Sequence, residues 1–80
     1  MTTVTPPALA FQIGEVFKFA VGDCMGGVQF AVVSRDVAHG LRTYLLLSQD
    51  PDYPGLTRIE TEAMLLAMRE MERILAGVDG

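Results

Sequence analysis

The sequence predicts a small α+β fold that is mainly β, with antiparallel strands followed by one C-terminal helix. Two observations indicate the strands: apolar residues alternate over 28–37, and a second extended segment at 41–49 follows a short loop that contains glycine. A third observation indicates the helix, because residues 62–76 are almost all strong helix formers. The chain has 80 residues, so we expect a single domain over 11–80, preceded by a flexible arm with two prolines over 1–10.

The first extended segments are expected within two similar pieces, FQIGEV at 11–16 and FAVGDC at 19–24. In the second piece, Gly22 permits a backbone angle that other residues avoid. Asp23 can then accept hydrogen bonds from nearby backbone amides. The stretch GDCMGG is therefore typical of a turn or loop.

A β-hairpin is expected next, with strands over 28–37 and 41–49 joined by a three-residue loop in which Gly40 takes the left-handed position. On the first strand, alternation puts Val28, Phe30 and Val32 on one face and Gln29, Ala31 and Val33 on the other. On the second strand it separates two faces, one with Leu41, Thr43, Leu45 and Leu47 and one with Arg42, Tyr44, Leu46 and Ser48. Both strands thus carry apolar residues on both faces. We therefore expect either the C-terminal helix or another subunit to cover the outer face.

The hairpin is predicted to end at QDPDYPG, residues 49–55, where two prolines and a glycine break the strand. Residues 56–60 then favour a short strand that points Thr57 and Ile59 inward. Thr61 is expected to cap the helix that follows, because a threonine hydroxyl can accept a hydrogen bond from an amide of the first turn.

This order of elements resembles the small SH3-like or Tudor-like barrels, over roughly residues 11–66. The resemblance rests on the opening FAVGD, the hairpin, the Pro-Gly corner and the short strand that runs into a helical turn. It implies a strongly bent sheet of four to five antiparallel strands closed on a small core, as in many short phage and bacterial proteins. It implies no function, because barrels of this form host many.

One family of this architecture is an enzyme of nearly this length, the type II plasmid dihydrofolate reductases. Its frame PG-x-x-x-I-x-x-x-A-x-L resembles Pro54, Gly55, Ile59, Ala63 and Leu65 of this chain. The family has Val-Gln-Ile-Tyr where this chain reads Thr-Arg-Ile-Glu, so the folate and nicotinamide contacts have no counterpart. A small oligomeric enzyme with a site between subunits is kept as an alternative function.

Composition argues against several other classes of protein. The formal charge is −4, from ten acidic and six dispersed basic residues, whereas nucleic-acid binders carry a positive patch. Weak nucleic-acid binding would require Arg35, Arg42 and Arg58 to converge, and it is kept as a further alternative. No apolar run approaches the ~20 residues of a membrane span, and the single Cys24 fits a reducing, cytoplasmic location.

No catalytic, cofactor-binding or metal-ligating residue is assigned, which favours a protein that is not an enzyme. Cys24 is next to an acid, which disfavours a thiolate, and a pair with His39 would require two loops to meet. Asp50 and Asp52 are interpreted as turn residues, because calcium prefers six or more oxygen ligands.

The C-terminal helix carries the strongest indication of function. Met64, Met68, Met71, Leu75 and Val78 are spaced alternately by four and three residues, which is the spacing of a heptad seam. Further apolar residues, at Leu65, Leu66 and Ile74, make the apolar surface wider than one groove of a small barrel would cover. Methionine side chains also adapt to irregular partner surfaces.

A second candidate contact is Tyr53, held between two prolines in the turn at 49–55. It is expected either to pack against Leu56 or the helix, or to meet a ligand at the barrel rim. The sequence thus predicts a non-catalytic protein-interaction or adaptor module that forms a homodimer through its helix. The alternatives are a different protein partner, or a helix that packs only on its own barrel. The partner-binding residues assigned are Met64, Met68, Met71, Leu75 and Tyr53.

Overall fold

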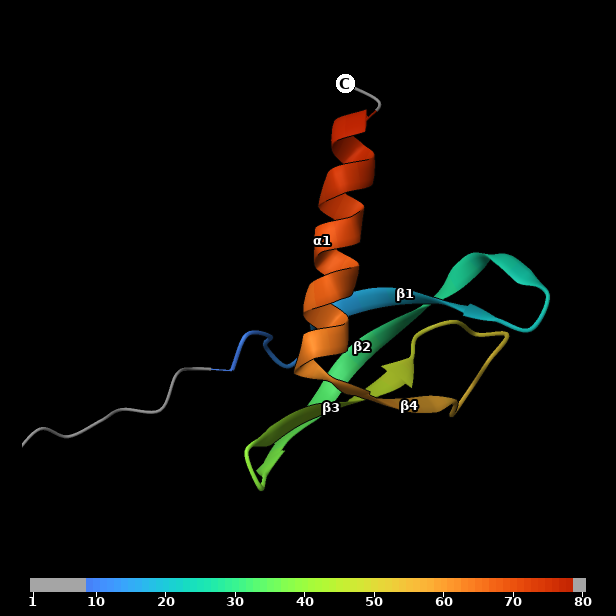
Figure 1. The fold of residues 1–80 in the computed structure, drawn as a ribbon. Helices are drawn as coiled ribbons and strands as arrows, with labels where there is room; N and C mark the ends of the chain where they lie inside the picture. The colour runs from blue at the N-terminus through green and yellow to red at the C-terminus, as the bar shows by residue number, and fades with distance from the viewer. Residues whose placement is uncertain (1–8, 79–80) are drawn as a thin grey trace, which may run out of the picture.

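The structure is a computed structural model that describes residues 9–78, apart from the side chains of residues 24, 25 and 78. Its elements, in chain order, are β1 (Val16–Val21), β2 (Cys24–Ala38), β3 (Leu41–Ser48), β4 (Thr57–Thr61) and α1 (Glu62–Val78). The strands form one antiparallel sheet in the order β1-β2-β3-β4, which curls into a half-barrel from which the helix rises (Figure 1). The predicted fold class is therefore confirmed, and the sheet is an open one with two edges.

The turn between β2 and β3 is tighter than predicted. Ala38 still pairs with Leu41, so the loop contains only His39 and Gly40, with φ angles of 53° and 76°. Two consecutive residues with positive φ are typical of a type I′ turn, whose twist matches that of the strands it joins. The expectation of a three-residue loop was wrong because histidine, and not only glycine, adopts the left-handed conformation here.

The core lies on the concave face of the half-barrel. Its buried side chains are Phe11, Phe17, Phe19, Val28, Phe30, Val32, Tyr44, Leu46 and Leu65. Three edge-to-face ring pairs hold the aromatic part together, and the closest has ring centroids 5.1 Å apart, between Phe11 and Phe17. The face predicted for Val28, Phe30 and Val32 is the buried one, as is that of Tyr44 and Leu46.

The predicted orientation of β4 was wrong. Ile59 points outward with 72% of its surface exposed, and Thr57 is also exposed. The concave side of β4 instead carries Arg58 and Glu60, whose side chains are joined by hydrogen bonds of 3.0 and 2.9 Å to Glu60 Oε2. The Arg58 guanidinium lies over the Phe19 ring, 4.3 Å from its centroid, and so covers the core where an isoleucine had been expected.

The outer face of the sheet is not covered by the helix, contrary to one of the two expectations. Leu65 enters the concave core, so α1 packs on the inner side of the half-barrel. On the outer side, Leu45 of β3 pairs with the exposed Ile59 of β4. The helix in the described residues is not long and apolar enough to cross a bilayer.

Candidate interaction surface on the C-terminal helix

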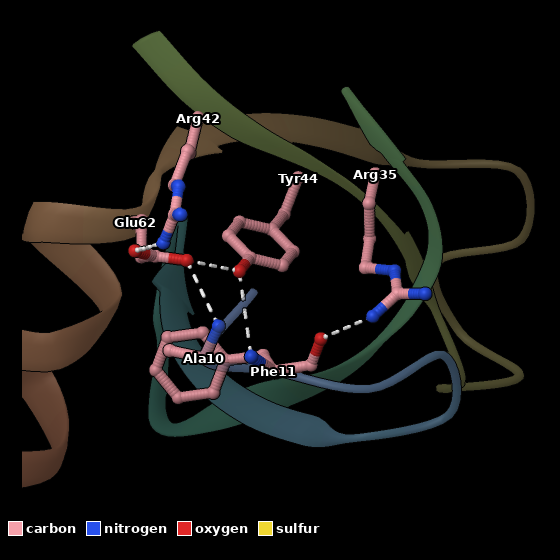
Figure 2. A network of polar contacts seen from close by, with 6 residues as sticks. All are labelled: Ala10, Phe11, Arg35, Arg42, Tyr44 and Glu62. Atoms are coloured by element: carbon pink, nitrogen blue, oxygen red, sulfur yellow. Dashed lines mark hydrogen bonds and ion pairs between the residues drawn. The ribbon is translucent and has the colours of Figure 1, made fainter. Parts of the chain in front are cut away.

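The helix is fixed at its base by a network of polar contacts centred on Glu62, its first residue (Figure 2). Glu62 Oε2 accepts hydrogen bonds from the Ala10 backbone N–H at 3.0 Å and from the Tyr44 hydroxyl at 2.5 Å. Its other oxygen, Oε1, accepts a hydrogen bond from Arg42 Nη1 at 2.9 Å. The Tyr44 hydroxyl in turn accepts one from the Phe11 N–H at 3.3 Å. One carboxylate thus joins the helix to β3 and to the segment that precedes β1.

These contacts shift the protonation equilibria of the two central groups. The pKa of Glu62 is lowered to about 2, first by the Ala10 N–H, then by the Tyr44 hydroxyl, and also by the Arg42 guanidinium. The pKa of Tyr44 is raised, first by burial and then by its bond to the Glu62 carboxylate. Both shifts favour the pair as it stands, a charged acceptor and a neutral donor.

The N-terminus of the helix is capped as predicted. Thr61 Oγ1 accepts a hydrogen bond from the Met64 N–H at 3.2 Å, which satisfies one of the donors that a helix start leaves open. The negative charge of Glu62 in the first turn also complements the positive end of the helix dipole. The helix therefore begins at a fixed point and in a fixed direction at the end of β4.

The next turn supplies the remaining attachment to the sheet. Leu65 is fully buried in the core, and Met68 packs against its edge. Arg69 places its guanidinium 3.9 Å from the centroid of the Phe17 ring and donates from Nη2 to the Val16 carbonyl at 2.9 Å. After Arg69, no described helix side chain is buried or half-buried.

Removing the Arg69 guanidinium should weaken this attachment measurably. We expect Arg69→Gln to lower the free energy of unfolding by about 1 kcal/mol, because it loses both the cation–π contact and the bond to Val16. Urea denaturation followed by circular dichroism measures the change. Arg73→Gln is the matched control, since Arg73 is exposed and its ion pair in the described structure is with the exposed Glu70 on the same helix. A change of equal size in both would contradict the role assigned to Arg69.

The second half of the helix stands clear of the sheet (Figure 1). Every described side chain from Glu70 to Gly77 is exposed. One side of the helix nevertheless remains apolar, with exposed fractions of 52% at Met64, 56% at Met71, 47% at Ile74 and 58% at Leu75. These four residues, spaced by seven, three and one, fall on one face of an α-helix. We call this set of four side chains the helix face.

The predicted partner-binding residues divide between exposed and packed positions. Met64, Met71 and Leu75 belong to the helix face, whereas Met68 lies at its boundary with the core. The side chain of Val78, the last member of the predicted seam, lies outside the described part of the structure. Tyr53 lies on the β3–β4 loop, where it packs against the core rather than beside the other four.

Sequence reasoning treated Glu62 and Arg69 only as charges on another face of the helix and assigned no role to Tyr44, although these three residues anchor the helix. The only local signal was the position of Glu62 directly after a capping threonine, where an acid stabilises a helix start. The partners of Glu62 lie 52 and 18 positions earlier in the chain, so no local pattern could have identified them. Ile74 was noted as widening the seam, and it is one of the four exposed residues of the helix face.

The arginines considered for nucleic-acid binding are each engaged with a different acceptor. Arg35 Nη1 donates to the Phe11 carbonyl at 3.1 Å, as Figure 2 shows. Arg42 contacts Glu62, and Arg58 contacts Glu60. Each of the three guanidinium groups thus has an acceptor within its own chain.

The Asp50–Asp52 corner forms a turn in the described structure. The Asp52 N–H donates to Asp50 Oδ1 at 2.9 Å, and the Tyr53 N–H donates to the Asp50 carbonyl at 3.0 Å. Within residues 9–78, no group of three or more histidine, cysteine, aspartate or glutamate side chains is placed to hold a metal ion. No pocket is found among these residues either.

Comparison of the chain with protein-family models, with curated proteins and with solved structures finds no match. The likeness to small barrels consequently stays a likeness of form. The helix face and its anchoring contacts are the features from which a function can be argued.

Proposed function

We propose that this protein is a non-catalytic interaction module that self-associates through the helix face. The observation that carries the proposal is the exposure of Met64, Met71, Ile74 and Leu75 on one side of a helix whose second half has only exposed side chains among the described residues. A helix that is anchored only at its base gains nothing for its own fold from an apolar surface on its far half. A second copy of the same helix would bury that surface.

The energetics favour a weak dimer. Fully burying an exposed methionine, leucine or isoleucine side chain contributes ~1.5–3 kcal/mol, so each of these half-exposed residues would contribute about 1 kcal/mol. Eight such residues in a dimer compete with an association cost of ~4–15 kcal/mol. The net gain is then at most ~4 kcal/mol, so we expect a dissociation constant of the order of 1 mM at the tightest, a concentration that a larger assembly could supply locally.

The choice of side chains also fits an interface. Methionine is flexible and polarizable, so the two methionines of the helix face can adjust to a facing helix without strict shape matching. The rigid base fixes where the helix leaves the sheet, so less conformational entropy is lost when two helices pair. In such a dimer, each copy would have its half-barrel at the base of the paired helices.

Sedimentation velocity between 10 µM and 1 mM tests the proposal. We expect the wild-type protein to associate over this range, and Met71→Glu to associate measurably less at each concentration, because a charge would be buried against the second helix. Leu66→Glu is the matched control: Leu66 is also apolar and 49% exposed, but it lies on another side of the helix.

The controls make the result specific to the helix face. Leu66→Glu should associate as the wild type does. A wild-type protein that stays monomeric at 1 mM, or a Leu66→Glu variant that dissociates as fully as Met71→Glu, would overturn the proposed function.

A further inference from the structure

The open half-barrel has two edge strands, and they are protected to different degrees. Unpaired edges are templates for pairing with other chains, and natural proteins protect them with bulges, lysines or covering groups. The pairing of β1 with β2 shifts in register between Phe19 and Val21, β1 contains Lys18, and its Val16 carbonyl accepts a hydrogen bond from Arg69. The β1 edge is therefore protected against pairing with a strand of another chain.

The edge at β4 is protected less: Arg58 and Glu60 are charged and point inward, but the strand has no bulge, lysine or covering group among the described contacts. β4 pairs with β3 without a register shift from Thr57 to Thr61, and it contains neither lysine nor proline. The side chain at its centre, Ile59, is 72% exposed, which is the largest fraction among the exposed large hydrophobic residues of the described structure. A regular, uncovered edge with an apolar centre is the kind that a further strand can extend.

The register shows which backbone groups this edge presents. The Ser48 N–H donates to the Leu56 carbonyl at 2.8 Å, so Leu56 faces β3. Backbone groups alternate in direction along an antiparallel strand. Arg58 and Glu60 therefore also direct their N–H and C=O groups to β3, and Ile59 directs both of its groups outward.

The sequence of β4, Thr-Arg-Ile-Glu-Thr, is complementary to itself when it is reversed. We propose that β4 pairs with β4 of a second copy, antiparallel and about a two-fold axis at Ile59. In that register each Arg58 lies opposite Glu60 of the second copy, and each Thr57 lies opposite its Thr61. Opposite charges and threonine pairs placed directly across two strands are both stabilising.

The backbone geometry agrees with this register. The two Ile59 residues have outward-facing groups, so they form a hydrogen-bonded pair that exchanges both N–H···O bonds. Arg58 and Glu60 of the second copy then form a non-hydrogen-bonded pair, in which side chains lie closest. On the outer face of the sheet, the two Ile59 side chains meet between the two Leu45 side chains that already pair with them.

This contact goes beyond the helix proposal and does not depend on it. It uses a different element, and the helix leaves β4 at Thr61 and rises from the sheet rather than running along the edge (Figure 1). The partner is a second copy of this chain, because Arg58 and Glu60, on either side of Ile59, carry opposite charges and complement each other across the two-fold axis. Both contacts are of the self-complementary kind that generates two-fold symmetry.

Amide hydrogen exchange, resolved by residue with NMR, tests the pairing. We expect exchange of the Ile59 N–H to slow at least ~10-fold between 20 µM and 2 mM protein, as the amide becomes bonded to the second copy. The Arg58 and Glu60 amides, already bonded to β3, should not change and serve as internal controls. Ile59→Lys should remove the concentration dependence, whereas Val37→Lys, at an exposed position on β2, should keep it.

A charge exchange tests the register itself. Arg58→Glu alone and Glu60→Arg alone each place like charges across the two-fold axis, so each should lose the Ile59 protection. An equal mixture of the two single variants places opposite charges at both positions and should restore the protection in a mixed dimer.

The outcomes separate this inference from the helix proposal. Wild-type Ile59 exchange that is independent of concentration would overturn the β4 pairing, even if sedimentation shows a dimer that Met71→Glu dissociates. A mixture of the charge variants that stays unprotected, while Ile59→Lys and wild type behave as expected, would overturn the proposed register.

Discussion

Replacing Leu65 with alanine is expected to lower the free energy of unfolding by about 3 kcal/mol, within the range of large-to-small changes at buried leucines. Leu65 is the helix residue that is fully buried, and it packs into the core formed by the concave face of the sheet. A domain of this size has a total stability of only ~4–12 kcal/mol, so the loss would be a large part of it. Urea denaturation monitored by circular dichroism measures the change.

The neighbouring residue supplies the control. Leu66 is 49% exposed, so Leu66→Ala removes the same atoms from the same helix without opening a cavity. We expect its effect to stay below ~1 kcal/mol. If the two variants were equally stable, the helix would not be docked through Leu65, and the description of its base would be wrong.

The second large effect is expected from the Glu62 carboxylate and appears as a pH dependence. The folded-state pKa of about 2 is below the ordinary value of 4.5, so the folded state favours the charged form. The resulting stability is fully present above ~pH 5 and is lost as the pH falls toward 2, with a total of about 2–3 kcal/mol. Glu62→Gln removes the charge at all pH values, so it should be less stable by this amount at pH 7.

The difference between the two proteins isolates the contribution of Glu62 from other acids. Free energies of unfolding at pH 7, 5, 4 and 3 should converge for wild type and Glu62→Gln as the pH falls. Glu72→Gln is the control, because Glu72 is exposed and its ion pair in residues 9–78 is with Arg69 on the same helix. We expect it to follow the wild type within ~0.5 kcal/mol. A constant gap between wild type and Glu62→Gln across this pH range would contradict the assigned network.

The central hairpin was predictable because its signals are local. Strict alternation placed Val28, Phe30 and Val32 on one shared face, which the structure shows to be the buried one, and a glycine marked the turn at Gly40. The same reasoning failed at β4, because hydrophobicity alone predicted that the Ile59 side chain points inward. The pleat there is set by the pairing with β3, and an ion pair over the Phe19 ring takes the inner side instead.

The candidate surface was predictable in part for the same reason. Helical spacing identified Met64, Met71 and Leu75, since residues that share a face can be read from one segment. Spacing could not show that the sheet covers only the first two turns of the helix. That depends on Arg69 and Glu62 reaching residues far away in the chain, at Val16 and Ala10.

The most direct test of the central claim is to follow the methionine methyl groups of Met64 and Met71 by NMR as the protein is concentrated from 20 µM to 1 mM. A sample that mixes labelled and unlabelled chains adds a search for contacts between copies. We predict that both methyl resonances shift with concentration and that the Met71 methyl contacts Leu75 or Ile74 of another copy. Methyl resonances that do not change with concentration, with no contact between copies at 1 mM, would contradict self-association through the helix face.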